Sequence, residues 1–105
     1  MSESASKLRT AVIERVLEAS ATTSTERRRA AFDNAGVEEA ACVLVDKVTR
    51  TAWKVTDEDV AAARAAGLAE DAIFELVVAA ALGQSSRQLA SALAVLDEVA
   101  PKKKP

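Results

Sequence analysis

One carboxylate stands out among the few residues of this chain that could do acid–base chemistry. Glu75 lies between Phe74 and the apolar run Leu76-Val77-Val78. Burial in such a segment raises the pKa of a carboxyl group and suits it to general acid or base catalysis. The alternatives are an ion pair with Arg64 or Arg87, or a helix face that reaches water. Glu75 and Arg87 are therefore the candidate catalytic residues, although we favour a structural role for both, with Arg87 binding a carboxylate or the carbonyl groups at a helix C-terminus.

Other catalytic chemistry is restricted because the chain has no histidine, no tyrosine and one cysteine. Histidine is the usual general base near neutral pH and a common metal ligand. A single cysteine cannot form a Cys-x-x-Cys redox pair. Cys42 stands among Ala40, Ala41 and Val43, so we expect it to be buried and inert rather than a nucleophile. No phosphate loop or dinucleotide fingerprint occurs. These features predict no metal and no cofactor, and they favour a protein that is not an enzyme.

Three consecutive arginines, Arg27, Arg28 and Arg29, have two interpretations. They could clamp a phosphate or another anion. They could instead form a solvated helix face that pairs with Glu26, Asp33 or a neighbouring subunit. We favour the second interpretation, because no aromatic residue or glycine-rich loop accompanies the arginines.

Two further charged clusters are better explained by helix ends and chain termini than by ligands. The acidic run 57–59 follows Thr56, which predicts a capped first helical turn rather than a metal site. Lys102, Lys103 and Lys104 fall in a basic tail, 101–105, that we expect to be disordered. The whole chain has 14 basic and 16 acidic residues, so three terminal lysines make nucleic-acid binding an unfavoured function.

Composition and periodicity predict an all-α protein with one helical domain over 1–100. Half of the 105 residues are hydrophobic but only 3% are aromatic, and alanine-rich chains of this kind favour helix. Apolar spacing and capping residues predict helices over about 3–19, 23–35, 37–53, 57–66 and 70–97. Thr23 and Glu26 have the spacing of a capping box. Gly83 interrupts the last helix, and we favour one long helix with a close backbone contact there over two kinked helices.

The most apolar stretch, 71–82, predicts contacts between copies of the chain. A helix that is apolar on every side has to be buried on every side, which is difficult within 105 residues. We therefore expect a homo-oligomer. No apolar run reaches the roughly 20 residues that a membrane span needs, and the first residues lack a signal pattern. We expect a soluble, cytoplasmic protein that does not bind membranes.

A known family shares the order of these features. Val-Thr-Asp-Glu-Asp-Val at 55–60 precedes Ala-Ala-Gly-Leu at 65–68, the apolar stretch 71–82 and Arg87. This order resembles the C-terminal half of the carboxymuconolactone decarboxylase and alkylhydroperoxidase-like (AhpD-like) family, over about residues 45–97. The resemblance implies an AhpD-like helical bundle that assembles into dimers, trimers or hexamers. It also implies either peroxide reduction by a Cys-x-x-Cys pair with a nearby histidine and glutamate, or decarboxylation of a lactone.

The chain departs from that family where the redox chemistry would take place. Cys42 precedes the matching stretch without a second cysteine or any histidine. Thiol peroxidase activity is therefore not expected, and only Glu75 and Arg87 match the family pattern. We predict a non-redox, homo-oligomeric binding or accessory module for a small-molecule ligand or a partner protein. The alternative is a carboxylate-dependent enzyme, decarboxylase- or lyase-like, that uses Glu75 as base and Arg87 to hold an anionic substrate in an inter-subunit cavity.

Overall fold

The regular secondary structure of this protein is entirely helical over residues 3–99, which the computed structural model describes. The all-α prediction is thus confirmed, while the basic tail predicted at 101–105 lies outside the described residues. The elements are α1 (Glu3–Glu18), α2 (Thr25–Asp33), α3 (Glu39–Thr51), the 3₁₀ turn η1 (Ala52–Lys54), α4 (Asp57–Ala65) and α5 (Glu70–Val99). None of these helices has the combination of length and hydrophobicity that crossing a membrane requires.

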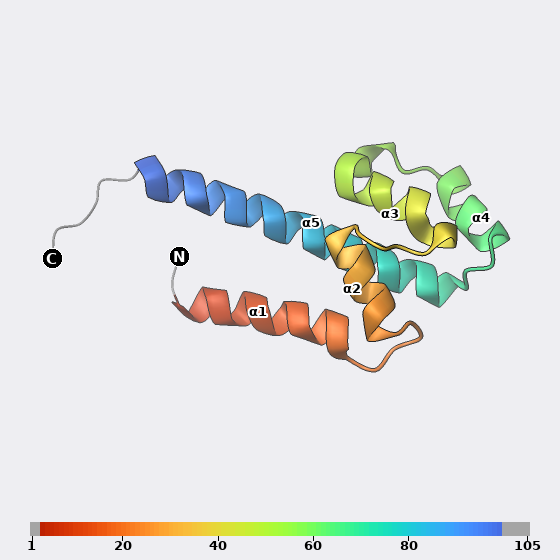
Figure 1. Ribbon diagram of the computed structural model, residues 1–105, viewed down its shortest axis with the longest axis horizontal. Coiled ribbons are helices and arrows are strands. Elements are labelled where there is room, and N and C mark those ends of the chain that lie inside the picture. Colours follow the sequence, from red (N-terminus) through yellow and green to blue (C-terminus); the bar gives the residue numbers. More distant parts are fainter. Residues whose placement is uncertain (1–2, 100–105) are drawn as a thin grey trace, which may run out of the picture.

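The helices form a compact head and a projecting arm (Figure 1). The head consists of α2, α3, α4 and residues 70–83 of α5. The arm consists of α1 and residues 84–99 of α5, and its two helices run side by side in opposite directions. At 1.5 Å per residue, the 30 residues of α5 span about 45 Å, so this helix extends well beyond the head.

Side-chain caps explain where two of the helices begin. Ser24 caps α2 by accepting a hydrogen bond from the backbone N–H of Arg27 at 3.2 Å. The predicted capping box of Thr23 with Glu26 is therefore wrong, because the helix begins one residue later. A capping box does open α4, where Thr56 and Asp59 bind each other's backbone N–H groups. The acidic run 57–59 thus occupies a first helical turn, as expected.

The helix α5 continues unbroken through Gly83, so the alternative of two kinked helices is wrong. Gly83 is buried where the backbone of Phe32 at the end of α2 crosses it. A Cβ atom at this position would overlap the carbonyl oxygen of Phe32. The predicted close backbone contact at this glycine is confirmed.

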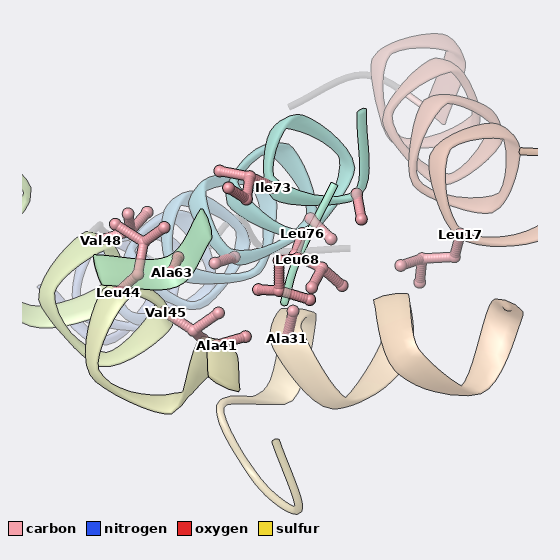
Figure 2. Close-up of a cluster of buried hydrophobic side chains, with 13 residues drawn as sticks. Leu17, Ala31, Ala41, Leu44, Val45, Val48, Ala63, Leu68, Ile73 and Leu76 are labelled. Carbon is pink, nitrogen blue, oxygen red and sulfur yellow. The ribbon is translucent and has the colours of Figure 1, made fainter. Parts of the chain in front are cut away.

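The hydrophobic core lies between α2, α3, α4 and the first half of α5 (Figure 2). Within the apolar stretch of α5, one face is buried: Ala72, Ile73, Leu76, Ala79 and Ala80. Phe74 on the other side of the helix is 69% exposed. Val77, Val78 and Leu82 are half-buried, so the chain itself covers most of this stretch and leaves the side of Phe74 exposed. Contacts between copies of the chain at 71–82 stay a prediction.

Candidate functional site

Glu75 ties the first half of α5 to the loop that joins α1 and α2. Its Oε1 accepts hydrogen bonds from the backbone N–H and the hydroxyl of Thr23, both at 2.7 Å. Its Oε2 accepts a third bond from the backbone N–H of Thr22 at 3.0 Å. Thr23 is itself buried. Both carboxylate oxygens are thus engaged in holding this loop against α5.

The pKa of Glu75 is lowered, and the prediction of a raised pKa is wrong. Partial burial acts to raise the pKa, but the hydrogen bonds from Thr23 and Thr22 favour the charged form and outweigh the burial. The net result is a pKa of about 2 instead of the usual 4.5. The local sequence could not reveal this, because the donors come from more than fifty residues away along the chain.

Neither arginine considered as an ion-pair partner of Glu75 binds it. Arg64 donates to Glu70 instead. Arg87 donates from Nη1 to the carbonyl oxygen of Phe32 at 2.6 Å and from Nη2 to the side chain of Gln84 at 3.4 Å. The expectation that Arg87 binds carbonyl groups at a helix C-terminus is met, because Phe32 lies in the last turn of α2.

The two candidate catalytic residues are also far apart along their helix. Twelve residues separate Glu75 from Arg87, which corresponds to about 18 Å along the axis of α5. Glu75 is engaged at the base of the α1–α2 loop, and Arg87 at the far end of α2. Within one subunit they do not line a common pocket.

The three consecutive arginines point to three different surroundings. Arg27 binds Glu38 with two hydrogen bonds, at 2.6 and 3.1 Å, rather than the predicted Glu26 or Asp33. Arg28 is 4% exposed and donates from Nη1 to the carbonyl oxygen of Val16 at 2.7 Å. Arg29 is exposed. The three side chains therefore do not form a single anion clamp.

Sequence reasoning missed the burial of Arg28, although its spacing contained a signal. Arg28 lies three and four residues before Ala31 and Phe32, which are buried and half-buried. Residues at this spacing share one helix face. Arg28 thus belongs to the core face of α2, where its guanidinium binds the last turn of α1.

Cys42 is exposed, so the prediction of a buried cysteine is wrong. The helix α3 buries the face that carries Ala41, Leu44, Val45 and Val48, and Cys42 lies off that face. Adjacent alanines misled the prediction, because helix faces are set by spacing rather than by direct neighbours.

A surface groove of about 500 Å³ lies between α3 and α4. Half of its lining residues are alanines, and each helix contributes one charged residue. The lining consists of Glu39, Ala40, Val43, Leu44, Asp59, Ala62, Ala63 and Ala66. Asp59 is already bound by Lys47 at 2.9 Å, and this hydrogen bond holds the pKa of Asp59 below its usual range. Glu39 is exposed at the rim. Nothing in the local sequence pattern predicted this groove, because it depends on how α3 and α4 pack.

Neither a metal-binding group among the described side chains nor a similar known protein indicates what reaction or ligand this chain serves. Among residues 3–99 no group of three or more histidine, cysteine or acidic side chains is placed to hold a metal ion. The chain matches no protein-family model, and comparisons with curated proteins and with solved structures also find no match. Membership of the AhpD-like family stays a prediction.

Proposed function

We propose that this protein is a homo-oligomeric, non-redox helical module of the cytoplasm that binds a small ligand or a partner protein. In this proposal it is a member of the AhpD-like family that keeps the helical scaffold without the reactive groups. The observation that carries the proposal is the engagement of Glu75. Both of its oxygens accept hydrogen bonds from the α1–α2 loop, so the carboxylate acts as a structural tie.

The same observation weighs against the carboxylate-dependent enzyme. A general base works best when its pKa lies near the working pH. Glu75 has a pKa of about 2 and is therefore a weak base near neutral pH. Arg87 is bound to the carbonyl oxygen of Phe32 and lies about 18 Å along the helix from Glu75. No observation favours a shared substrate site for these two residues.

The groove between α3 and α4 supports a binding role. Its alanine floor lets a flat apolar group approach the helix backbones closely, and Val43 adds apolar surface at its edge. Glu39 at the rim offers an unneutralised carboxylate, whereas Asp59 is paired with Lys47. An apolar group that carries a positive charge therefore suits the groove best.

A titration followed by backbone-amide NMR tests this binding role with phenethylamine as the probe. We expect shift changes confined to the groove, and smaller changes with phenylpropionate, whose charge Glu39 repels. The variant Ala62→Arg fills the groove from an exposed position and should abolish the changes. Shift changes around Glu75 in place of the groove, or none at millimolar phenethylamine, would refute the binding role as stated here.

A peroxidase assay tests the non-redox part of the proposal. With hydrogen peroxide as oxidant and dithiothreitol as reductant, we expect turnover at the level of the protein-free reaction, and no change on Cys42→Ser. Turnover that disappears in Cys42→Ser would show a thiol peroxidase and contradict the proposal. The exposure of Cys42 ensures that the reagents reach the thiol in the folded protein.

A further inference from the structure

The arm carries an unusual concentration of exposed apolar side chains. Its two helices expose five large hydrophobic residues by 52% to 72%: Leu8, Val12, Val95, Leu96 and Val99. The other large hydrophobic residues that are exposed, Val43, Trp53 and Phe74, belong to different helices of the head. Contiguous apolar patches on a soluble protein commonly mark an interaction surface.

The inner faces of the arm are distinct from these exposed residues. On α5 the half-buried residues Leu82, Ser86, Leu89 and Leu93 recur at alternating spacings of four and three, and Gln84, also half-buried, lies off this face. On α1 the face covered by the rest of the chain includes Ile13, Val16 and Leu17. These faces are the sides of the two helices that the rest of the chain covers, and on α1 Ile13 and Leu17 pack with the core. The buried faces explain how the arm is attached to the rest of the chain. They do not explain why its five large hydrophobic residues are exposed.

The exposed residues form a second stripe on each helix. On α5 this stripe is Ala92, Val95, Leu96 and Val99, with spacings of three, one and three. At about 100° per residue, its centre lies roughly 95° around α5 from the inner face. On α1 the stripe of Leu8 and Val12, continued by Ala19 just after the helix, lies about 110° from the inner face, in the same rotational sense along the chain.

The two stripes lie on the same side of the arm. Figure 1 shows that the two helices run in opposite directions. Equal rotations from their facing sides therefore turn both stripes toward one side. On α1 the stripe borders a shallow surface hollow lined by Leu8, Ala11, Val12 and Ala19, together with charged residues. One side of the arm therefore carries apolar residues of both helices, bordered by Glu14, Arg15 and Glu18 around the hollow.

The dimensions of this face match an interface between two copies of the chain. Sixteen residues of α5 give a length of about 24 Å, and two helices of about 10 Å diameter give a width of about 20 Å. The apolar stripe of α5 occupies eight of these residues, 92–99, and polar residues such as Gln88 share the face. The whole side of the arm covers roughly 480 Å² in projection, so two copies bury about 1,000 Å², the lower limit for a specific interface. A two-helix layer with one apolar face is also half of a four-helix bundle, and the complement of such a half is another copy of itself.

We propose that two copies of this protein pack the apolar faces of their arms together, through Leu8 and Val12 of α1 and Val95, Leu96 and Val99 of α5, to form a four-helix bundle. The heads, with the α3–α4 groove, stay outside this contact. The inference supplies a specific interface for the homo-oligomer of the proposed function, and it does not rest on the ligand-binding role of the groove.

Light scattering after size exclusion of the full chain tests the interface. We expect twice the chain mass of 11.0 kDa for the wild type. Val95→Lys should raise the dissociation constant at least tenfold and shift the protein to a monomer, because a buried unpaired lysine opposes association. Val43→Lys is the matched control, since it makes the same change at an exposed valine of the head and should leave the mass unchanged.

The remaining outcomes separate this inference from the wider proposal. Val12→Lys, on the other helix of the arm, repeats the test if Val95→Lys loses helical circular dichroism. An oligomer that neither arm variant dissociates overturns the arm interface and leaves the homo-oligomer standing. A wild type that stays monomeric at about 100 µM, well above micromolar dissociation constants, overturns both. A larger assembly that Val43→Lys dissociates and Val95→Lys does not would place the interface on the head and also overturn the inference.

Discussion

Replacing Glu75 by glutamine removes the charge that holds the α1–α2 loop against α5. The glutamine keeps the size of the side chain, but it presents an NH₂ group to one of the backbone N–H donors of Thr22 and Thr23. That donor then faces another donor in a partly buried site, and the remaining hydrogen bonds lose the strength that a charged acceptor gives them. We therefore expect Glu75→Gln to fold with reduced stability.

The size of the effect follows from the pKa of Glu75. A fall from 4.5 to about 2 corresponds to roughly 2.5 units, and at 1.36 kcal/mol per unit the upper limit is about 3 kcal/mol. Contact of Glu75 with solvent reduces this figure, so we expect a loss of about 1–2 kcal/mol in the free energy of unfolding at pH 7. For a domain of this size the loss lowers the Tm by roughly 5–10 °C.

The pH dependence gives the sharper test. Because the pKa of Glu75 is lower in the folded state, its contribution is complete above the unfolded pKa of 4.5 and disappears as the pH falls toward about 2. The stability difference between wild type and Glu75→Gln should therefore shrink between pH 5 and pH 2. Asp46 and Asp59 also have lowered pKa values, but they are unchanged in both proteins and cancel in the difference.

Urea unfolding followed by circular dichroism, at one protein concentration, measures this difference at pH 7 and pH 3. Thr23→Val removes one hydroxyl donor and should reproduce part of the loss. Asp71→Asn makes the same kind of change at an exposed position in the first turn of α5, so it should cost less than about 0.5 kcal/mol. A stability difference for Glu75→Gln that is as large at pH 3 as at pH 7 would show that the reasoning from the pKa is wrong.

Two further substitutions test other contacts that hold the helices together. Gly83→Ala forces a methyl group onto the carbonyl oxygen of Phe32, so we expect the free energy of unfolding to fall by about 3 kcal/mol or more. Thermal unfolding measures this loss. A Tm within 2 °C of wild type, which corresponds to roughly 0.5 kcal/mol, would refute the close contact. Arg28→Met leaves the part-buried carbonyl oxygen of Val16 without its donor and should cost about 2–3 kcal/mol by urea unfolding. Arg29→Met, on the exposed neighbour, should change stability by less than about 0.5 kcal/mol, and equal losses would contradict the burial of Arg28.

Local patterns predicted the helices well because the relevant physics acts within a few residues. Apolar spacing and capping residues together located the five α-helices of residues 3–99, and the cap at Thr56 correctly placed the beginning of α4. Gly83 was also interpreted correctly, since a glycine inside an apolar helix commonly marks a close backbone contact. The capping box at Thr23 was wrong because Ser24, one residue later, offers the same chemistry and the sequence does not rank the two.

The candidate site was not predictable in the same way. The apolar neighbours of Glu75 suggested a raised pKa, but the groups that set its pKa are donors in a loop more than fifty residues away. Arg28 was expected to be exposed and is buried, whereas Cys42 was expected to be buried and is exposed. The packing of α2 and α3 determines which face of each helix is covered. Neighbouring residue types do not contain that information.

The sequence by itself determined an all-helical chain with few groups for catalysis, because residue propensity, capping and the lack of histidine can be read without knowing which helices touch. Only the tertiary structure decided that Glu75, Arg28 and Arg87 bind the ends and loops of other helices, and that apolar side chains of α1 and α5 stay exposed along the arm. Hydrogen bonds and helix faces of this kind depend on where distant segments meet in space. The spacing of residues along the sequence describes each helix by itself and does not show which segments come into contact.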